Sequence, residues 1–471
     1  MRLLPFLALF PLALPAALAA QGRAPVPRQP IDWPALEREG VALLRDYLRV
    51  NTSNPPGNEL EAARFLQAFL AKQGIEAQIL DTTELGAGRA NLYARVKGNG
   101  TKKAIALVHH LDVVPATAST WSAPPFSGAL RDGFIYGRGA LDMKAEGIAQ
   151  LMAVVALKRG GVPLTRDLVI IANADEEWGS TGALTFADKH ADLLRDVEFL
   201  FTEGGSNSVR NDTVRFRGVG VSEKRTFWQR LTVRGTPSHG SRPTKDNPVP
   251  RLIAALDRLA RHETPLHVTA GVDRYFRDIS RDYPGEQGRW LQNVSRALDD
   301  PRAREWILSN VYWNAIVRNT ITITALQGSN KTNVIPPEAS AEVDIRLLPD
   351  QDPDSVLATL TAVVADTAVK LTPLIVPKAP FESATNTDFF RAVERVSRER
   401  DPGAFVTSTM LTGATDRPMY RRLGMQVYGV DPFRTNDEER QRGIHGNDER
   451  IGVDNFVSGI RFLFDVLRYV Q

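Results

Sequence analysis

The 471-residue chain contains no cysteine. This absence excludes disulfide bonds, lipid attachment through a cysteine and thiolate ligands for a metal, so the mature protein must be stable without disulfides. The chain also has little excess charge of either sign, because 58 Lys and Arg residues are balanced by 55 Asp and Glu residues. The charges are interspersed and form no long basic run, so we expect no nucleic-acid partner despite a pI near 9.0.

Long apolar runs are missing beyond the first twenty residues, so we expect no membrane span in the mature protein. Residues 1–20 join an early basic residue to an apolar stretch and a small-residue end, which is typical of a secretory signal peptide. An uncleaved anchor is the alternative, but Pro5, Pro11 and Pro15 interrupt the run of about 20 apolar residues that a span needs. With a Pro-rich tether over 21–30, the pattern predicts a periplasmic or secreted protein.

The length predicts two domains, since single cores stop growing at roughly 250 to 300 residues. Apolar runs at 104–108 and 168–172 alternate with helical patterns such as 147–158. This alternation indicates an α/β fold with a mainly parallel sheet flanked by helices on both faces. We assign 31–221 and 377–471 to this larger domain.

The pattern between these two segments is that of a smaller α+β domain. Residues 227–233 alternate as a half-exposed strand should, and 354–370 carry a helical pattern. We assign 222–376 to an inserted lid domain. An additional helical stretch at about 267–313, rich in Arg, Asp, Trp and Tyr, is included in it. Its aromatic residues hint at an apolar substrate, but a core role is favoured because aromatic residues dominate cores.

Polar residues directly after the apolar strands are the first candidates for a site, because ligands bind beyond the carboxyl ends of strands in open α/β sheets. His110 and Asp112 follow the strand that ends at Val108. Alternation places both on one side, where Asp112 can fix the tautomer of an imidazole that binds a metal. A pair of solvated loop residues is the alternative.

Carboxylates follow three further turns or strands. Asp142 ends a glycine-broken turn before a helix, where simple helix capping is the alternative. Glu176 and Glu177 belong to an acidic cluster that costs energy unless a cation lies there, and one of them can bind metal while the other moves a proton. Glu203 ends another strand, with an ordinary turn as the alternative. His445 lies in a polar turn, and these nitrogen and oxygen ligands suit a pair of zinc ions.

The sequence resembles the two-zinc aminoacylase and carboxypeptidase family that includes acetylornithine deacetylase, succinyl-diaminopimelate desuccinylase and carboxypeptidase G. The resemblance runs from about Trp33 to the C-terminus and rests on eight motifs in the family's order: HLDVVP, GRGALDMK, DEEWGS, TEGG, GTPSHGSRP, KTNVIPPEASAEVDIRLLP, GATD and HGNDER. It implies a zinc-exopeptidase-like fold with an inserted ferredoxin-like lid and dimerisation domain. The long lid resembles the carboxypeptidase S branch.

The resemblance also implies a role for each site residue. Two Zn²⁺, or Co²⁺ or Mn²⁺ in their place, would be held by five ligands, with His110 and Glu203 on one ion, Glu177 and His445 on the other, and Asp142 bridging them. Asp112 would orient His110, and Glu176 would be the general base. The family often has a cis peptide after the bridging aspartate, which predicts a cis Asp142–Met143 bond.

Residues of the lid would complete the site. The resemblance implies that His239 stabilises the oxyanion, often across a dimer interface, and that Asn333 and Arg346 contact the substrate. Arg346 suits a bidentate grip on a carboxylate, and an ordinary strand-end salt bridge is the alternative. Gly413 and Thr415 would line the substrate pocket.

These residues predict an exported zinc-dependent hydrolase that cleaves the amide bond of a peptide C-terminal residue or of an N-acyl amino acid. A reversible N-acyl amino acid synthase and hydrolase is one alternative. A periplasmic peptide-binding protein without catalysis is another, and it is weakened because every expected ligand and the base are present. The sequence does not decide between a monomer and a homodimer, and the resemblance implies that a homodimer would form through the lid.

Overall fold

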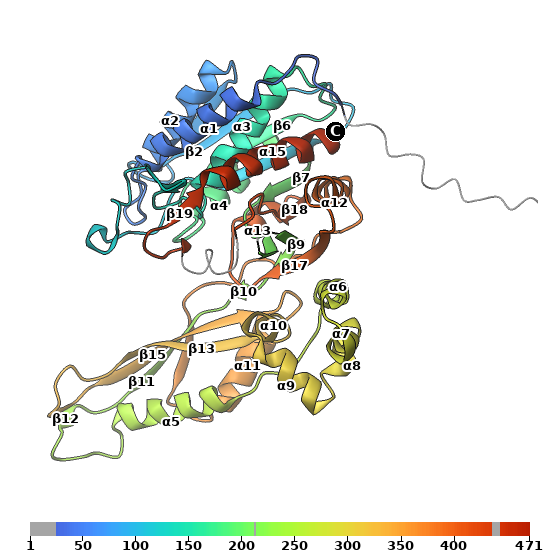
Figure 1. The fold of residues 1–471 in the computed structure, drawn as a ribbon. Helices are drawn as coiled ribbons and strands as arrows, with labels where there is room; N and C mark the ends of the chain where they lie inside the picture. Colours follow the sequence, from blue (N-terminus) through green and yellow to red (C-terminus); the bar gives the residue numbers. More distant parts are fainter. Residues whose placement is uncertain (1–24, 212, 436–442) are drawn as a thin grey trace, which may run out of the picture.

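The computed structural model describes residues 25–211, 213–435 and 443–471. Figure 1 shows a larger sheet with its helices and, below it, a smaller sheet with helices of its own. The signal peptide expected at residues 1–20 lies outside the described residues. None of the described helices is long and apolar enough to cross a membrane.

Nine strands form the larger sheet: β1 (Ala77–Leu80), β2 (Asn91–Val96), β3 (Ala104–His110), β6 (Leu168–Asn173), β7 (Val197–Thr202), β8 (Ser206–Arg210), β9 (Thr213–Glu223), β17 (Phe405–Leu411) and β18 (Gln426–Gly429). Their order is β1-β2-β6-β3-β7-β18-β9-β17, with β8 paired to β9. The centre is parallel from β6 through β3 and β7 to β18, whereas β1, β2 and β8 pair antiparallel. A small sheet of β4 (Ala129–Arg131), β5 (Phe134–Tyr136) and β19 (Arg450–Gly452) lies beside it.

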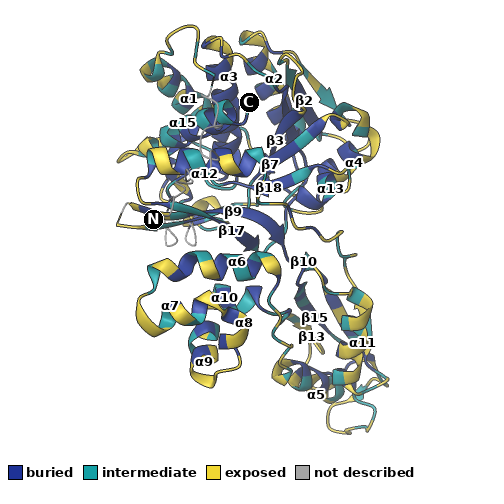
Figure 2. Ribbon diagram, turned by 90° about the vertical axis from the view of Figure 1, so that its right-hand side faces the viewer, coloured by how far each residue is buried: buried dark blue, intermediate teal, exposed yellow. Residues whose placement is uncertain are grey.

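Helices cover both faces of the larger sheet: α1 (Trp33–Leu48), α2 (Glu59–Lys72), α3 (Lys144–Arg159), α12 (Asp388–Arg400) and α15 (Val453–Tyr469) on one, α4 (Thr181–Lys189) and α13 (Arg417–Arg421) on the other. Successive side chains of a strand point to opposite faces. Accordingly, Ile105 and Leu107 of β3 pack with the first group of helices, and Ala106 and Val108 pack with the second. The predicted α/β class is confirmed, and Figure 2 shows the buried central strands.

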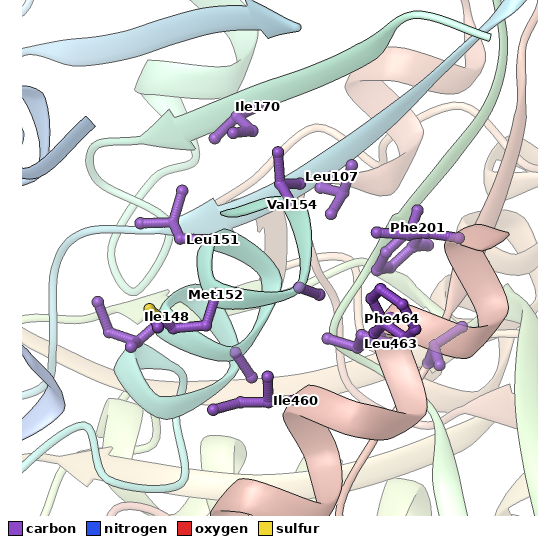
Figure 3. Packing of buried hydrophobic residues seen from close by; sticks show 14 of the residues in the cluster. Leu107, Ile148, Leu151, Met152, Val154, Ile170, Phe201, Ile460, Leu463 and Phe464 are labelled. Carbon is purple, nitrogen blue, oxygen red and sulfur yellow. The ribbon is translucent and has the colours of Figure 1, made fainter. Parts of the chain in front are cut away.

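Helix α3 is enclosed on all sides, since every residue from Lys144 to Leu157 is buried. In Figure 3, Leu151 and Val154 face the sheet, and Ile460 of α15 lies on the opposite side of α3. A helix that is buried on all sides belongs to the core of its domain. Its beginning, two residues after Asp142, is therefore held in a fixed place relative to the sheet.

The lid contains a five-stranded sheet made of β10 (Arg225–Thr226), β11 (Gln229–Arg234), β13 (Thr320–Gln327), β15 (Glu338–Leu347) and β16 (Lys370–Pro373). Helices α5 (Pro248–Arg261) and α11 (Pro353–Val364) cover one face, and β15 alternates between buried and less buried residues as a half-covered strand should. The helix predicted over 354–370 is too long. It ends at Val364 because Ala365 adopts a left-handed conformation, after which β16 begins.

Five short helices make up the helical stretch of the insertion: α6 (Ala270–Ile279), α7 (Gly285–Gln292), α8 (Val294–Ala297), α9 (Pro301–Ser309) and α10 (Val311–Ile316). Their apolar side chains pack with Phe405 and Met410 of β17, in the larger sheet. Thr407 and Ser408 both hydrogen-bond to α6, at Asp278 and at the Gly271 carbonyl. The stretch lies within the lid in sequence, between α5 and β13, but its core is shared with the larger sheet, and Trp313 is buried in it.

Candidate metal centre

The predicted ligands gather beyond the ends of three adjacent parallel strands. His110 ends β3, Glu176 and Glu177 follow β6, and Glu203 follows β7. Because β6, β3 and β7 are neighbours and parallel, their carboxyl ends meet at the same edge of the sheet. His110, Asp142 and Glu177 each present one ligand atom within 4.8 Å of the others, and so do His110, Glu176 and Glu203.

Asp142 lies between the two histidines. Its Oδ1 is 3.0 Å from Nε2 of His110, and its Oδ2 is 3.2 Å from Nε2 of His445. His445 Nε2 is also 3.1 Å from Oε2 of Glu177, and His110 Nε2 is 3.9 Å from Oε1 of Glu203. One carboxylate thus offers a separate oxygen to each imidazole, which is the arrangement that two neighbouring cations need. The Asp142–Met143 peptide is cis, as predicted.

Asp112 contacts His110 in a different way from the one we predicted. Nδ1 of His110 donates to the backbone carbonyl of Asp112 at 2.9 Å, whereas Oδ1 of that carboxylate is 3.6 Å from the nitrogen, too far for a hydrogen bond. The carboxylate accepts instead from the backbone N–H groups of Glu176 and Glu177, each at 3.1 Å. Asp112 therefore orients the imidazole through its main chain and fixes the two glutamates through its side chain.

Burial and mutual repulsion shape the ionisation of the acidic groups. Burial raises the pKa of Glu203 to about 8, with the charge of Asp142 adding to it. Burial also raises the pKa of Glu176, with Glu203 next in effect. Burial opposes ionisation of Asp142 as well, but its hydrogen bonds to His110 and His445 outweigh this and hold its pKa below the usual range. Carboxylates placed so close together favour a bound cation.

The side chains fit metal ions in their chemistry as well as their position. Glu177 keeps Oε1 buried without a hydrogen-bond partner among the described residues. An orphaned buried carboxylate oxygen is costly, and coordination of a cation would satisfy it. Imidazole nitrogens and carboxylate oxygens with no thiolate suit zinc, cobalt or manganese.

Glu449 holds the turn that carries Asp142, a role that our sequence reasoning missed. Its fully buried carboxylate accepts from the backbone N–H groups of Gly139, Leu141 and Asp142 at 2.7 to 3.1 Å. The guanidinium of Arg138 donates to it at 2.7 Å. Glu449 is the fifth residue of the HGNDER motif, so the motif was a signal, but the partners of Glu449 lie about three hundred positions earlier.

Glu449→Gln should weaken metal binding by about 10- to 100-fold, because an amide nitrogen facing these donors loosens the turn that positions Asp142. We expect the curve of activity against metal concentration to shift to higher metal, with kcat recovering at saturation. A purely structural role would lower stability without this shift. Glu305→Gln, a change at an exposed position, serves as control. A Glu449→Gln activation curve with the same midpoint metal concentration as the unmutated chain would refute the role.

A second support, also missed, joins Asp112 to the loop that carries the glutamates. Nδ2 of Asn54 donates to Asp112 and to Asp175, both at 2.8 Å. Arg89 donates to Asp175 and to the side-chain oxygen of Asn54, both at 2.6 Å. Asn54 and Arg89 come from segments far from Asp112 and Asp175 in sequence, and no strand-end pattern marks these two residues.

Two predicted lid residues lie far from this centre. His239 belongs to β12 (Ser238–His239), which pairs with β14 (Val334–Ile335), and the N–H of Gly240 donates to the carbonyl of Asn333. In Figure 1, β12 lies at the end of the lid farthest from the larger sheet. The His239 ring is exposed, and its Nδ1 accepts from Ser241. His239 and Asn333 are thus neighbours, but this chain does not bring them to its own centre.

Arg346 lies near the junction of the lid with the larger sheet. It donates to both carboxylate oxygens of Asp344, at 2.7 and 3.1 Å, and to the hydroxyl of Thr226. Its guanidinium also lies over the ring of Trp228, 5.7 Å from the centroid. The strand-end salt bridge that we weighed as the alternative is therefore present in this conformation.

Gly413 and Thr415 belong to the turn after β17. Thr415 is buried, and its hydroxyl donates to Glu223 at 2.8 Å and accepts from Arg417. Its carbonyl accepts from Lys378 at 3.1 Å. The Thr415 side chain is thus engaged inside the protein, and Gly413 at the tip of the turn is partly exposed.

Comparison with known proteins places the chain in a family. A profile described as peptidase family M20/M25/M40 matches residues 106–469. The chain belongs to this family. The M20 assignment confirms the family predicted from the motifs, and it makes the chain an amidohydrolase or peptidase in class.

Several relatives cover most of the chain. Human N-fatty-acyl-amino acid synthase/hydrolase is 32% identical over 373 residues, covering 77% of this chain and 73% of the relative. Human aminoacylase-1 is 27% identical over 435 residues, covering 91% and 94%. A probable carboxypeptidase S-like protein of Dictyostelium discoideum is 26% identical over 378 residues, covering 78% and 72%.

Solved structures of M20 proteins share the fold. An M20 family metallo-carboxypeptidase of Sulfolobus solfataricus superposes with a TM-score of 0.72 at 19% identity, covering 92% of this chain and 99% of its own. Human carnosine dipeptidase 1 gives 0.65 at 17% identity, covering 93% and 98%. At these identities the likeness concerns the fold alone.

Proposed function

We propose that this M20 protein is an exported two-zinc hydrolase that cleaves the amide bond of an N-acyl amino acid or of a peptide C-terminal residue. The observation that carries the proposal is Asp142, whose two oxygens face His110 and His445 separately, with Glu177 and Glu203 beside them. The resemblance of most of the chain to an aminoacylase and to a probable carboxypeptidase S-like protein supports the class of bond.

In this proposal the five ligands would hold two divalent cations, which would supply Lewis-acid activation of a water molecule and of the scissile carbonyl. Zinc is the expected ion, with cobalt or manganese able to take its place. Glu176, fixed by its N–H bond to Asp112, takes the proton of the attacking water and returns it to the leaving nitrogen. Burial raises the pKa of Glu176, with the charge of Glu203 next in effect, and a raised pKa suits a carboxylate that both takes and returns a proton.

The lid supplies the remaining groups. We propose that Arg346 exchanges Asp344 for the substrate carboxylate and that Asn333 and His239 reach a centre only across a homodimer. The exposed position of His239 at the tip of the lid supports a shared site. Export to the periplasm or medium rests on the N-terminal sequence alone.

The test is the release of free amino acid from a panel of N-acyl amino acids and dipeptides by the purified mature protein. We expect about two metal ions per chain, chelator-sensitive turnover of some substrates, and recovery when zinc is added back. Absence of bound metal would overturn the proposal. Metal binding without cleavage of any substrate would favour the peptide-binding alternative.

A separate assay tests the reverse reaction, amide synthesis. The human relative named a synthase/hydrolase is the observation that favours this second candidate. Incubation of a free fatty acid with an amino acid at high concentration should then yield the amide, because a catalyst accelerates both directions of one equilibrium.

A further inference from the structure

Lys378 lies on the segment that returns from the lid, and it contacts two loops of the larger domain. Its Nζ donates to the hydroxyl of Ser180 at 2.8 Å and to the backbone carbonyl of Thr415 at 3.1 Å. Ser180 ends the loop of residues 174–180, which follows β6 and carries the proposed general base. We refer to this loop as the base loop. One ammonium group therefore joins the returning segment to the base loop and to the turn after β17.

The hydroxyl of Ser180 is used in an unusual way. Ser180 directly precedes α4, where a serine usually accepts a hydrogen bond from an N–H group of the first helical turn. Its side chain makes no such bond, and its backbone is left-handed, with a φ of 55°. Asp175, near the start of the base loop, is also left-handed, with a φ of 64°. Non-glycine residues adopt this conformation at a cost in energy, so contacts around the loop must hold it in place.

Different contacts hold the two ends of the base loop. Near its start, the carboxylate of Asp175 accepts from Arg89 at 2.6 Å. Near its end, the N–H groups of Gly179 and Ser180 donate to the carbonyl of Asp175, which closes the loop on itself. Lys378 adds a hydrogen bond from outside the loop at this end.

The main chain at Lys378 is connected to the lid. Its carbonyl accepts from Nε of Arg225 at 2.7 Å, and Nη1 of the same guanidinium donates to the carbonyl of Gln351 at 2.9 Å. Arg225 lies in β10, where the chain enters the lid, and Gln351 follows β15. The outgoing and returning segments between the larger domain and the lid therefore meet at Lys378.

We propose that Lys378 is a positioning residue for the general base. Through Ser180, it lets the segment that returns from the lid fix the end of the base loop, and with it the carboxylates of Glu176 and Glu177. This inference rests on the proposed function and adds a residue to the same site. Lys378 is partly buried, so its hydrogen bonds are less weakened by water than those of an exposed lysine.

Lys378→Met should lower kcat by about 10- to 100-fold at saturating zinc, because a small displacement of a catalytic group costs up to about this much. KM should change little. Lys378→Arg should restore most of the rate, since a guanidinium can donate to both acceptors. Lys370→Met is the matched control, because Lys370 is exposed and lies in β16, on the same returning chain. It should leave kcat unchanged.

A double-mutant cycle tests whether the effect passes through Ser180. Ser180→Ala removes the acceptor, so adding Lys378→Met should lower kcat by less than about a further twofold. A full additional loss would overturn the inference. Lys378 would then act in another way, such as by its charge on Asp416, whose pKa burial raises and the ammonium group lowers. A kcat of Lys378→Met equal to that of the unmutated enzyme would overturn it as well.

Hydrogen exchange separates this inference from the proposed function. In the metal-loaded protein, Lys378→Met should speed exchange of the N–H groups of residues 176–180 on the order of tenfold, because loss of a bond from a charged donor favours local opening by about that factor. Equal acceleration in β6 would indicate a general loss of stability and refute the role. If the unmutated protein hydrolyses nothing, the proposed function fails, and exchange alone decides the role of Lys378. Unchanged exchange in the base loop would refute it even in an active enzyme.

Discussion

Glu176→Gln should lower kcat by about 10³-fold while both metal ions remain bound, because a positioned general base contributes roughly 10² to 10⁴ to such reactions. The amide keeps the shape of the side chain and loses only the ability to accept a proton. Glu176 is not one of the five proposed ligands, although it lies within reach of His110 and Glu203. KM should change little, since the residue acts on water and the leaving nitrogen.

The measurement is steady-state kinetics together with metal content on the same sample. Glu305→Gln, at an exposed position in α9, is the matched control and should retain full activity. Loss of a metal ion in the Glu176 variant would show that this residue is a ligand. Activity within a fewfold of the unmutated enzyme would remove it from the mechanism.

His239→Ala should lower kcat on the order of 10² to 10³, the usual effect of removing one donor to an oxyanion. His239 lies at the tip of the lid, away from the metal centre of its own chain, so we expect it to act on the centre of a second copy. If a second copy supplies the ring, a homodimer contains two centres, each built from both chains. Metal content should be unaffected.

Mixing two inactive variants tests directly whether the site is shared between subunits. In equal mixtures of His239→Ala and Glu176→Gln chains, each mixed dimer would contain one centre with an intact base and an intact histidine. Since half of the dimers are mixed, activity should recover to about a quarter of the unmutated level after subunit exchange. No recovery, with exchange shown by mass, would mean that the site is not shared.

The metal ligands could be predicted because they follow buried strands whose apolar runs are visible in the sequence. His110 and Glu203 stand at the ends of such runs, and parallel strands bring their ends together. Glu449 and Asn54 could not be found in this way. Each acts on residues far away in the chain, 308 positions in the bond to Leu141 and 58 in the bond to Asp112, and no local period reports such pairs.

The lid shows the same limit. The strand pairs around β15 were predictable from alternation, whereas β16 (Lys370–Pro373) was not predicted, because it is short and mostly exposed and the predicted helix extended to its first residue. Only its pairing with β11 makes it a strand. Arg346 illustrates a different limit, since a bidentate partner was predictable but the choice between Asp344 and a substrate carboxylate depends on conformation.

The contacts of α6 with both Thr407 and Ser408 determine where this helix lies. Neighbouring side chains of a strand point to opposite faces, so a helix that bonds to both must run along the open margin of β17, the last strand of the larger sheet. Unpaired strand margins invite pairing with other chains. By covering this edge, the insertion therefore protects the protein against aggregation. A chain that lacked the insertion would expose the unpaired edge of β17 even if its metal centre were intact.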